Sequence, residues 1–183
     1  MSVRIRKVIV QDAEQIASIG IKTWNTSYRG IFPKEKLDNM SLKEATVNWT
    51  KIITDESRNP DLETFIVEIS DDKIIGYAGG GKFDKTTLCD CEIGRIYIQE
   101  EYQNKGYGTM LFNKMLDFFH TRNWKTMIIW TLEDSAYRRF YEKMKGVPRE
   151  KTIYTKWGKQ YDLLGYVWEN ISILQKKLQY LNY

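Results

Sequence analysis

The sequence has 183 residues, of which 42% are hydrophobic and 28% are charged, and its formal net charge is +4. This length suffices for one well-packed domain and is too short for two domains of ordinary size. The composition excludes an intrinsically disordered chain, and no apolar run approaches the roughly 20 residues that cross a bilayer. The N-terminus lacks the apolar core of a secretory signal, so we expect a cytoplasmic protein that does not bind membranes.

The cysteine and histidine content disfavours a metal site. Cys89, Cys91 and His120 are the only residues of these two types, and a tetrahedral zinc site would lack ligands. Residues two apart on a strand point to the same face, so a disulfide between the two cysteines would be strained. We therefore expect no metal and two reduced thiols.

The first part of the chain predicts a strand followed by two helices. Residues 3–10 alternate as a strand, the segment 12–15 resembles a capping box that opens a helix reaching about Gly30, and the segment 41–44 resembles a second capping box. The basic residues of the strand are expected to form a solvated face and not a nucleic-acid-binding surface; they are Arg4, Arg6 and Lys7.

Two strands and a glycine run follow. Residues 64–69 and 73–77 have strand composition and are joined by two aspartates, which predicts a hairpin. The three glycines at 79–81 are not followed by a convincing helix start, so we expect them to close the second strand with exposed backbone.

A second glycine-bearing turn lies between a strand and a helix. Residues 93–98 form a β-branched and aromatic run, and apolar residues then recur at helical spacing to about residue 122. Gly106 and Gly108 stand where the period changes, so the first amides of the helix are open to an anion, and Lys105 adds a positive charge. Taken alone, the Gly-x-Gly pattern favours an ordinary tight connection between strand and helix.

The rest of the chain completes the predicted domain. Residues 124–132 read as a strand, and a strand–helix–strand unit of this length predicts a right-handed crossover with parallel strands. Residues 151–167 read as a hairpin, and apolar residues from 171 to 181 predict a terminal helix that packs on its own domain or on a second subunit of a homodimer. We expect one domain over residues 1–168 and a helical tail over 169–183.

The turn and a later helix resemble one family. The segment 103–108 resembles the Gln/Arg-x-x-Gly-x-Gly/Ala segment of the GCN5-related N-acetyltransferase (GNAT) superfamily, and the segment 134–143 resembles the family helix that carries Phe-Tyr-Glu-Lys. The sequence departs from the family where Asp134 or Ser135 replaces a frequent Asn, and where Gly146-Val147 replaces Gly-Phe. The resemblance implies an α/β fold with a central mixed sheet flanked by helices, and N-acetyltransferase activity.

The resemblance also implies acetyl-coenzyme A as the cofactor. In the family, backbone amides of the turn hold the pyrophosphate, and the pantetheine arm lies along the preceding strand. On this sequence the cofactor-binding residues are then Ile96, Tyr97, Ile98, Gln103, Asn104, Lys105, Gly106, Tyr107, Gly108, Thr109, Asp134 and Ser135.

Two residues are candidates for proton transfer. Glu92 aligns with the catalytic carboxylate of histone-acetylating family members and is the candidate base. The alternatives are a carboxylate at the strand edge, a carboxylate paired with Arg95, and a water that acts as the base. Tyr141 matches the family tyrosine that protonates the coenzyme thiolate, and the alternative is ordinary helix packing.

The acceptor is expected to be a primary amine of a small molecule or a peptide. The resemblance places it against the first two helices, where Trp24, Tyr28 and Phe32 are the candidate substrate-binding residues, although the same aromatic side chains are compatible with a core. The alternative function is a non-catalytic domain that binds or senses acyl-coenzyme A.

Overall fold

The computed structural model describes residues 3–70, 72–84 and 88–174. Its elements in chain order are β1 (Val3–Lys7), η1 (Val10–Asp12), α1 (Ala13–Ser27), α2 (Lys34–Asp38), α3 (Leu42–Glu56), β2 (Leu62–Ile69), β3 (Lys73–Lys82), β4 (Cys91–Ile98), η2 (Glu100–Tyr102), α4 (Tyr107–Thr121), β5 (Met127–Leu132), α5 (Arg138–Lys143), β6 (Val147–Lys156) and β7 (Lys159–Trp168).

The seven strands form one mixed sheet with the order β1-β2-β3-β4-β5-β7-β6. The mixed α/β class predicted from the sequence is therefore confirmed. The chain divides into two compact units, one with residues 1–80 and 95–115 and the other with residues 81–94 and 116–183. Both β4 and α4 contribute residues to each unit.

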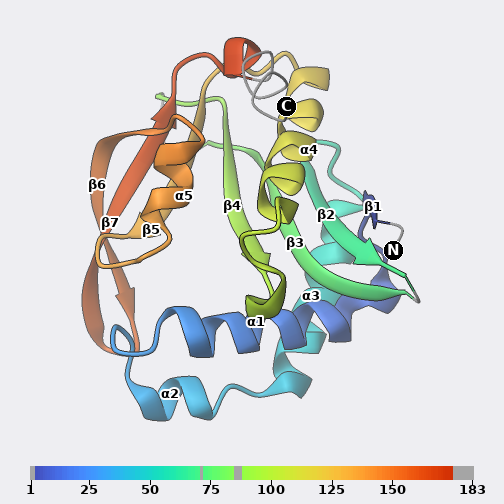
Figure 1. Cartoon of the computed structure of the whole chain (residues 1–183), viewed down its shortest axis with the longest axis vertical. Coiled ribbons are helices and arrows are strands. Elements are labelled where there is room, and N and C mark those ends of the chain that lie inside the picture. Colours follow the sequence, from blue (N-terminus) through green and yellow to red (C-terminus); the bar gives the residue numbers. More distant parts are fainter. Residues whose placement is uncertain (1–2, 71, 85–87, 175–183) are drawn as a thin grey trace. The chain divides into compact units, whose positions relative to one another are not determined.

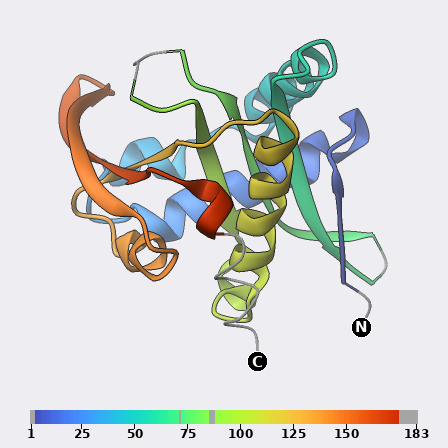
Figure 2. The same cartoon turned by 90° about the horizontal axis from the view of Figure 1, so that it is seen from above.

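The first unit contains α1, α2, α3 and the strands β1 to β3. β1 pairs antiparallel with β2, with Val3 opposite Ile69, and β2 and β3 run side by side in Figures 1 and 2. The helices α1 and α3 pack against each other. One buried core cluster of this unit joins both helices to the strands and consists of Ala13, Ile16, Ala17, Ile19, Trp49, Ile53, Ile66, Ile74 and Tyr77.

The prediction that the glycines at 79–81 close a strand with exposed backbone is wrong. β3 continues through them to Lys82, and Gly79 is buried. A Cβ atom on Gly79 would lie 2.3 Å from Thr64 Oγ1 and 3.3 Å from Arg95 Nε. The missing side chain therefore makes room for two neighbouring side chains inside the sheet.

One of the two predicted helix caps is also wrong. Asp12 makes no side-chain cap on α1; its carboxylate accepts hydrogen bonds from Arg6 Nη1 at 2.6 Å and Nη2 at 2.9 Å. A bidentate, charge-assisted pair of this kind outcompetes a single cap bond. The second cap is confirmed, because Ser41 Oγ accepts from the Glu44 amide at 3.2 Å. The short α2 was not predicted, since five residues show too little periodicity.

The expected solvated face of β1 is confirmed for Arg4 and Lys7, whose side chains are exposed, whereas Arg6 is largely buried in an ion-pair network. The Arg6 side chain is only 24% exposed and bonds Glu68 as well as Asp12, and Arg4 Nη2 lies 2.7 Å from Glu68 Oε1. Burial alone raises the pKa of Glu68, but the hydrogen bonds from Arg4 and Arg6 outweigh it, so its pKa lies below its ordinary value.

This depressed pKa predicts how stability depends on pH. Because the pKa of Glu68 is lower in the folded state than in the unfolded state, its ionisation stabilises the protein at pH values above the unfolded-state pKa of about 4.3. This stabilisation is lost as the pH falls through the folded-state pKa. We expect Glu68→Gln to lower the unfolding free energy at pH 7, and the difference from the unsubstituted protein to shrink below about pH 4.3. Denaturant unfolding from pH 7 to pH 3 measures this, with Glu35→Gln on the exposed side of α2 as the control. A difference that is independent of pH would contradict the assignment.

The second unit contains β5, α5 and the long β6–β7 hairpin, whose strands run side by side in Figures 1 and 2. β5 pairs parallel with the first half of β4, with Glu92 opposite Ile128, so the predicted parallel pairing is confirmed. Trp157 and Gly158 both have positive φ, at 51° and 74°, and form the two-residue turn of the hairpin.

The two cysteines are free and buried, as predicted. Cys89 packs in a small core with Phe83, Ile128 and Val167. Burial raises the pKa of Cys89 to about 11 and also raises the pKa of Cys91. Both thiols are thus protonated near neutral pH, which suits packing and not nucleophilic chemistry.

The predicted helical tail is described only at its start. Residues 171–174 are helical; Ile171 is buried, and its amide donates to the Lys125 carbonyl at 2.9 Å. The remainder of the predicted apolar stripe, residues 175–183, lies outside the described residues, and the division at residue 168 stays a prediction. In the part of the chain that the structure describes, no helix is long and apolar enough to cross a membrane.

The end of α5 depends on a left-handed lysine. The Gly146 amide donates to the Tyr141 carbonyl and the Lys145 amide to the Glu142 carbonyl, both at 2.9 Å, which is a Schellman motif. Lys145 takes the left-handed position, with φ 67°. Gly146 does not take the left-handed position. Its lack of a side chain leaves room for Trp168, because a Cβ atom on Gly146 would lie only 2.6 Å from the Trp168 ring.

We expect Lys145→Gly to raise the unfolding free energy by about 0.5–1 kcal/mol, because glycine adopts the left-handed conformation without steric cost. Denaturant unfolding measures the change. The matched control is Lys143→Gly inside α5, which should lower the unfolding free energy by about 0.5–1 kcal/mol. Destabilisation by both substitutions would show that the backbone of Lys145 is not strained.

Candidate active site

The turn before α4 presents backbone amides at an open helix end. Asn104 and Gly106 both have positive φ, at 59° and 87°, and nothing lies within 4 Å of a Cβ built on Gly106. The Met110 amide donates to the Gly106 carbonyl at 3.0 Å. The amides of residues 107–109 therefore precede the hydrogen-bonded turns of the helix and lie at its positive end. This arrangement favours an anion such as a phosphate.

A glutamine side chain fastens this turn to the end of β4. Gln103 Nε2 donates to the Ile98 carbonyl at 3.0 Å. On the other side of the strand end, the Gln99 amide donates to the Ile75 carbonyl of β3 at 2.9 Å. The resemblance implied that Gln103 contributes its backbone amide to the cofactor, but this amide donates to the Glu100 carbonyl at 3.1 Å. The Gln103 side chain holds the turn in register with the strand.

Two lysines place positive charge beside the turn. Lys105 Nζ lies 5.4 Å from the ring centroid of Tyr102, and Lys73 Nζ donates to the hydroxyl of the same tyrosine at 2.8 Å. Tyr107 packs on Tyr102 with ring centroids 6.5 Å apart. The predicted charge of Lys105 is therefore joined by that of Lys73, which sequence reasoning missed because it comes from the start of β3.

The three candidate substrate-binding aromatics form one cluster. Trp24 lies 5.1 Å from Tyr28 and 5.5 Å from Phe32, and Tyr28 lies 5.3 Å from Phe32, each measured between ring centroids. The Trp24 indole donates to the Tyr97 hydroxyl at 3.2 Å, which links α1 to β4. Phe32 is buried, whereas Trp24 and Tyr28 are half-buried. The cluster thus has a core side and a partly accessible side.

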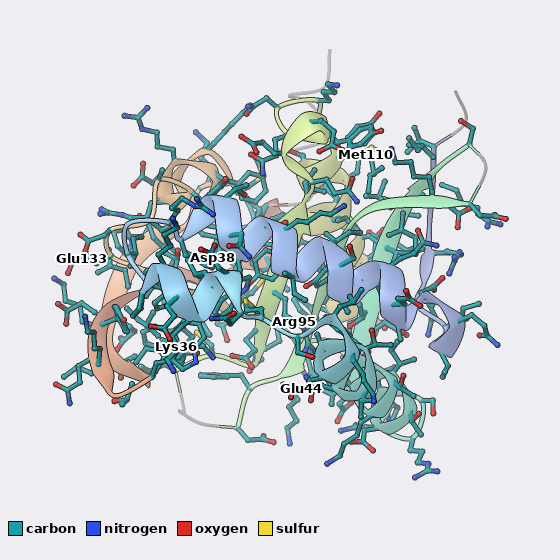
Figure 3. All side chains as sticks on the ribbon, turned by 90° about the horizontal axis from the view of Figure 1, so that it is seen from below. Lys36, Asp38, Glu44, Arg95, Met110 and Glu133 are labelled. Carbon is teal, nitrogen blue, oxygen red and sulfur yellow. The ribbon has the colours of Figure 1, made fainter. Side chains whose placement is uncertain are left out.

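Glu92 and Arg95 lie on β4. Glu92 is half-buried opposite Ile128. Arg95, which Figure 3 shows beside α3, pairs with Glu56 at 3.1 Å and stacks over Trp49 at 4.9 Å. Burial raises the pKa of Glu56, while the Arg95 charge and the Thr64 hydroxyl act in the opposite direction. The role of Glu92 as a base stays a prediction.

Tyr141 is held in a polar and aromatic setting on α5. It is 8% exposed, and its ring lies 5.6 Å from Tyr166 of β7. The Tyr166 hydroxyl donates to Glu142 Oε1 at 2.9 Å and accepts from Arg138 Nε at 3.3 Å. These bonds join α5 to β7 and hold the Tyr166 ring against Tyr141. Sequence reasoning missed Tyr166, although an aromatic hydroxyl within an apolar strand is a sign of a buried polar partner.

The two residues that replace the family asparagine differ in their surroundings. Ser135 is 4% exposed, and its hydroxyl accepts from the Tyr137 amide at 3.3 Å, so it shapes the entry to α5. Asp134 is exposed. Of the two, Asp134 has the more accessible side chain, and a cofactor contact by either residue stays a prediction.

Sequence comparisons identify related proteins. The model of the acetyltransferase (GNAT) family matches residues 21–146. An uncharacterised N-acetyltransferase of Bacillus subtilis strain 168, YuaI, is 24% identical over 177 residues, which cover 96% of this chain and 98% of the relative. Spermidine N(1)-acetyltransferase of Thermoplasma acidophilum is 28% identical over 115 residues, which cover 61% of this chain and 66% of the relative.

Solved structures show the same fold. The PaiA N-acetyltransferase of Thermoplasma acidophilum, solved in complex with coenzyme A, has a TM-score of 0.69 at 17% identity and covers 90% of this chain and 98% of its own. YncA of Salmonella typhimurium, solved with its cofactor acetyl-CoA, has a TM-score of 0.69 at 17% identity, with coverages of 92% and 94%. At a sequence identity of 17%, the structural similarity to these two proteins establishes the fold alone.

Proposed function

Because this chain belongs to the acetyltransferase (GNAT) family, we propose that it transfers an acetyl group from acetyl-coenzyme A to a primary amine of a small molecule or a peptide. The acceptor attacks directly in a ternary complex, since both cysteines are buried and poorly suited to carry the acyl group. The observation that carries the proposal is the open helix end at residues 103–109. Asn104 and Gly106 have positive φ there, and the space beside Gly106, next to the first amides of α4, is unoccupied.

The residues of the turn fit the cofactor. A pyrophosphate is an anion of the kind that a helix N-terminus binds, and in this proposal the amides of residues 104–109 would donate hydrogen bonds to it. The backbone of residues 96–98 would hold the pantetheine arm, and Lys105 would add positive charge. Asp134 or Ser135 supplies a further polar contact. When bound, acetyl-coenzyme A supplies the reactive thioester.

Proton transfer is assigned to two side chains. An alkylammonium has a pKa near 10.4, so about one molecule in 2,500 is neutral at pH 7, and Glu92 removes a proton from the acceptor directly or through a water. Tyr141 gives a proton to the departing thiolate. A phenol near pKa 10 and a thiol near 8.5 differ by about 1.5 units, or about 2 kcal/mol, so the transfer is only slightly uphill.

The acceptor proposal draws on the aromatic cluster and on one relative. Trp24 and Tyr28 offer partly accessible ring surface to an alkyl chain or a cation. A relative named spermidine N(1)-acetyltransferase makes polyamines the first compounds to test. We also propose, on the sequence alone, a cytoplasmic location and a homodimer.

The proposal is tested by measuring thiol release from acetyl-coenzyme A. The panel contains spermidine, an amino acid, an aminoglycoside and a peptide with a free amine, and at least one member is expected to release coenzyme A well above the rate with water alone. If coenzyme A stabilises the protein against heat but no amine accelerates thiol release, the protein is a non-catalytic binding or sensing domain.

A further inference from the structure

Two hydroxyl groups on α1 are buried without a hydrogen-bond partner. Thr23 is 6% exposed, and among the described residues neither its Oγ1 atom nor the Oγ atom of Ser27 meets a donor or acceptor. A buried polar group without a partner lowers the stability of a protein. A water, an ion or a ligand from outside the chain can complete such a pair.

Other helical threonines show that the arrangement is unusual. Thr26, Thr46, Thr50 and Thr54 each donate to the carbonyl four residues earlier, at 3.3, 2.8, 3.0 and 2.8 Å. This bond is the ordinary way for a helical hydroxyl to be satisfied. Thr23 does not make it, and the Thr23 carbonyl, which lies four residues before Ser27, accepts from Thr26 instead, at 3.1 Å. Neither hydroxyl is therefore satisfied by its own helix.

The two hydroxyls occupy one face of α1 beside the aromatic cluster. A spacing of four residues places Thr23 and Ser27 one above the other, and Gly20 continues the same face, where a Cβ would lie 2.9 Å from the Tyr77 hydroxyl. Trp24 and Tyr28 form the adjacent ridge of the helix. The Trp24 bond to Tyr97 shows that this ridge borders β4.

We propose that the hydroxyls of Thr23 and Ser27 form the polar end of the acceptor pocket and accept hydrogen bonds from the N–H groups of a primary alkylamine. The alkyl chain of the amine lies on the accessible rings of the aromatic cluster, those of Trp24 and Tyr28. This inference rests on the proposed function, because it assigns residues to the amine that receives the acetyl group.

Neutral hydroxyls suit a nucleophile that must lose a proton. A carboxylate beside the amine would favour the ammonium form and raise the pKa of the amine. A hydroxyl accepts from the neutral amine as well as from the ammonium, so it orients the nitrogen with less stabilisation of the charged form. The pair thus binds the acceptor without adding much to the cost of its deprotonation.

The test compares Thr23→Val and Ser27→Ala, alone and combined, with Thr26→Val as the matched control. The control removes a hydroxyl of the same helix that is already bonded to backbone carbonyls. We expect each of the first two substitutions to raise the KM for the amine about five- to tenfold, as expected for one lost hydrogen bond. Coenzyme A affinity should be unchanged, and the melting temperature of the ligand-free protein should be equal or higher.

A second measurement does not require turnover. Spermidine and n-butylamine are added to each protein with saturating coenzyme A, and the rise in melting temperature is recorded. The inference holds if an amine stabilises the unsubstituted and control proteins and this effect is lost in the double variant. It is overturned if no amine stabilises the unsubstituted protein, or if the double variant keeps the same KM and the same stabilisation, in which case the hydroxyls hold a buried water only.

The two measurements separate this inference from the proposed function. Absence of thiol release by the unsubstituted protein contradicts acetyl transfer, while the amine-dependent melting temperature still decides whether the hydroxyls bind an amine. Normal thiol release with unchanged KM values in the variants contradicts the hydroxyl site alone.

Discussion

Gly108→Trp is expected to weaken coenzyme A binding by at least about 100-fold while the protein remains folded. Residue 108 lies in the first turn of α4, where a tryptophan has a higher helix propensity than glycine. Its indole would cover the amides of residues 107–109 and displace the pyrophosphate. Titration calorimetry with coenzyme A measures the loss, and denaturant unfolding of the ligand-free protein should change by no more than about 1 kcal/mol.

The matched control for this experiment is Met110→Trp. Met110, labelled in Figure 3, lies in the same helix and is 39% exposed, so it accepts the larger side chain at the surface. Coenzyme A binding should be nearly unchanged in this variant. Equal affinities in the Gly108→Trp and unsubstituted proteins would remove the turn from the cofactor site.

Tyr141→Phe is expected to lower kcat about 100-fold, the lower end of the range for loss of a general acid. The affinity for acetyl-coenzyme A should stay the same, because phenylalanine keeps the ring that packs on Tyr166. Steady-state kinetics with the best amine of the panel, combined with calorimetry, separates the two quantities. Tyr154→Phe on β6 is the control for an identical change elsewhere in the second unit.

The same series tests how Tyr141 is positioned. Tyr166→Phe removes the hydroxyl that bridges Arg138 and Glu142, so kcat should fall by a smaller factor than in Tyr141→Phe, with the KM for the amine unchanged. If Tyr141→Phe turns over at the unsubstituted rate, the tyrosine is a packing residue and another group protonates the thiolate.

The sequence predicted the elements whose signals are local. The turn at 103–108 and the start of α4 follow from glycines at the point where strand periodicity becomes helical, and Ser41 caps α3 through an amide only three residues away. Failures came from partners in other structural elements. Asp12 resembled a helix cap, but Arg6 occupies its carboxylate, and Gly79 was read as a strand end although Thr64 and Arg95 pack against it.

The candidate site likewise combines contacts that a local sequence pattern predicts with contacts that it does not. The contacts among Trp24, Tyr28 and Phe32 follow from spacings of four residues that begin within one helix. The support of Tyr141 by Tyr166 joins residues 25 positions apart on α5 and β7, and a sequence pattern does not reveal such a pair. The unsatisfied hydroxyls of Thr23 and Ser27 were equally hidden, because residue type alone does not show whether a helical hydroxyl bonds its own backbone.

The Gln103 bond to the Ile98 carbonyl explains which residues are interchangeable at the first position of the turn motif. The motif that this chain resembles admits glutamine or arginine there, two side chains that differ in charge and shape. Both end in N–H donors on a stem long enough to reach back to the carbonyl at the strand end. In this protein, Gln103 Nε2 lies 3.0 Å from the Ile98 carbonyl oxygen. Asparagine is one methylene shorter, and the carboxylate of glutamate has no N–H group to donate to the Ile98 carbonyl. What the position requires is therefore a donor of sufficient reach, and charge is incidental to it.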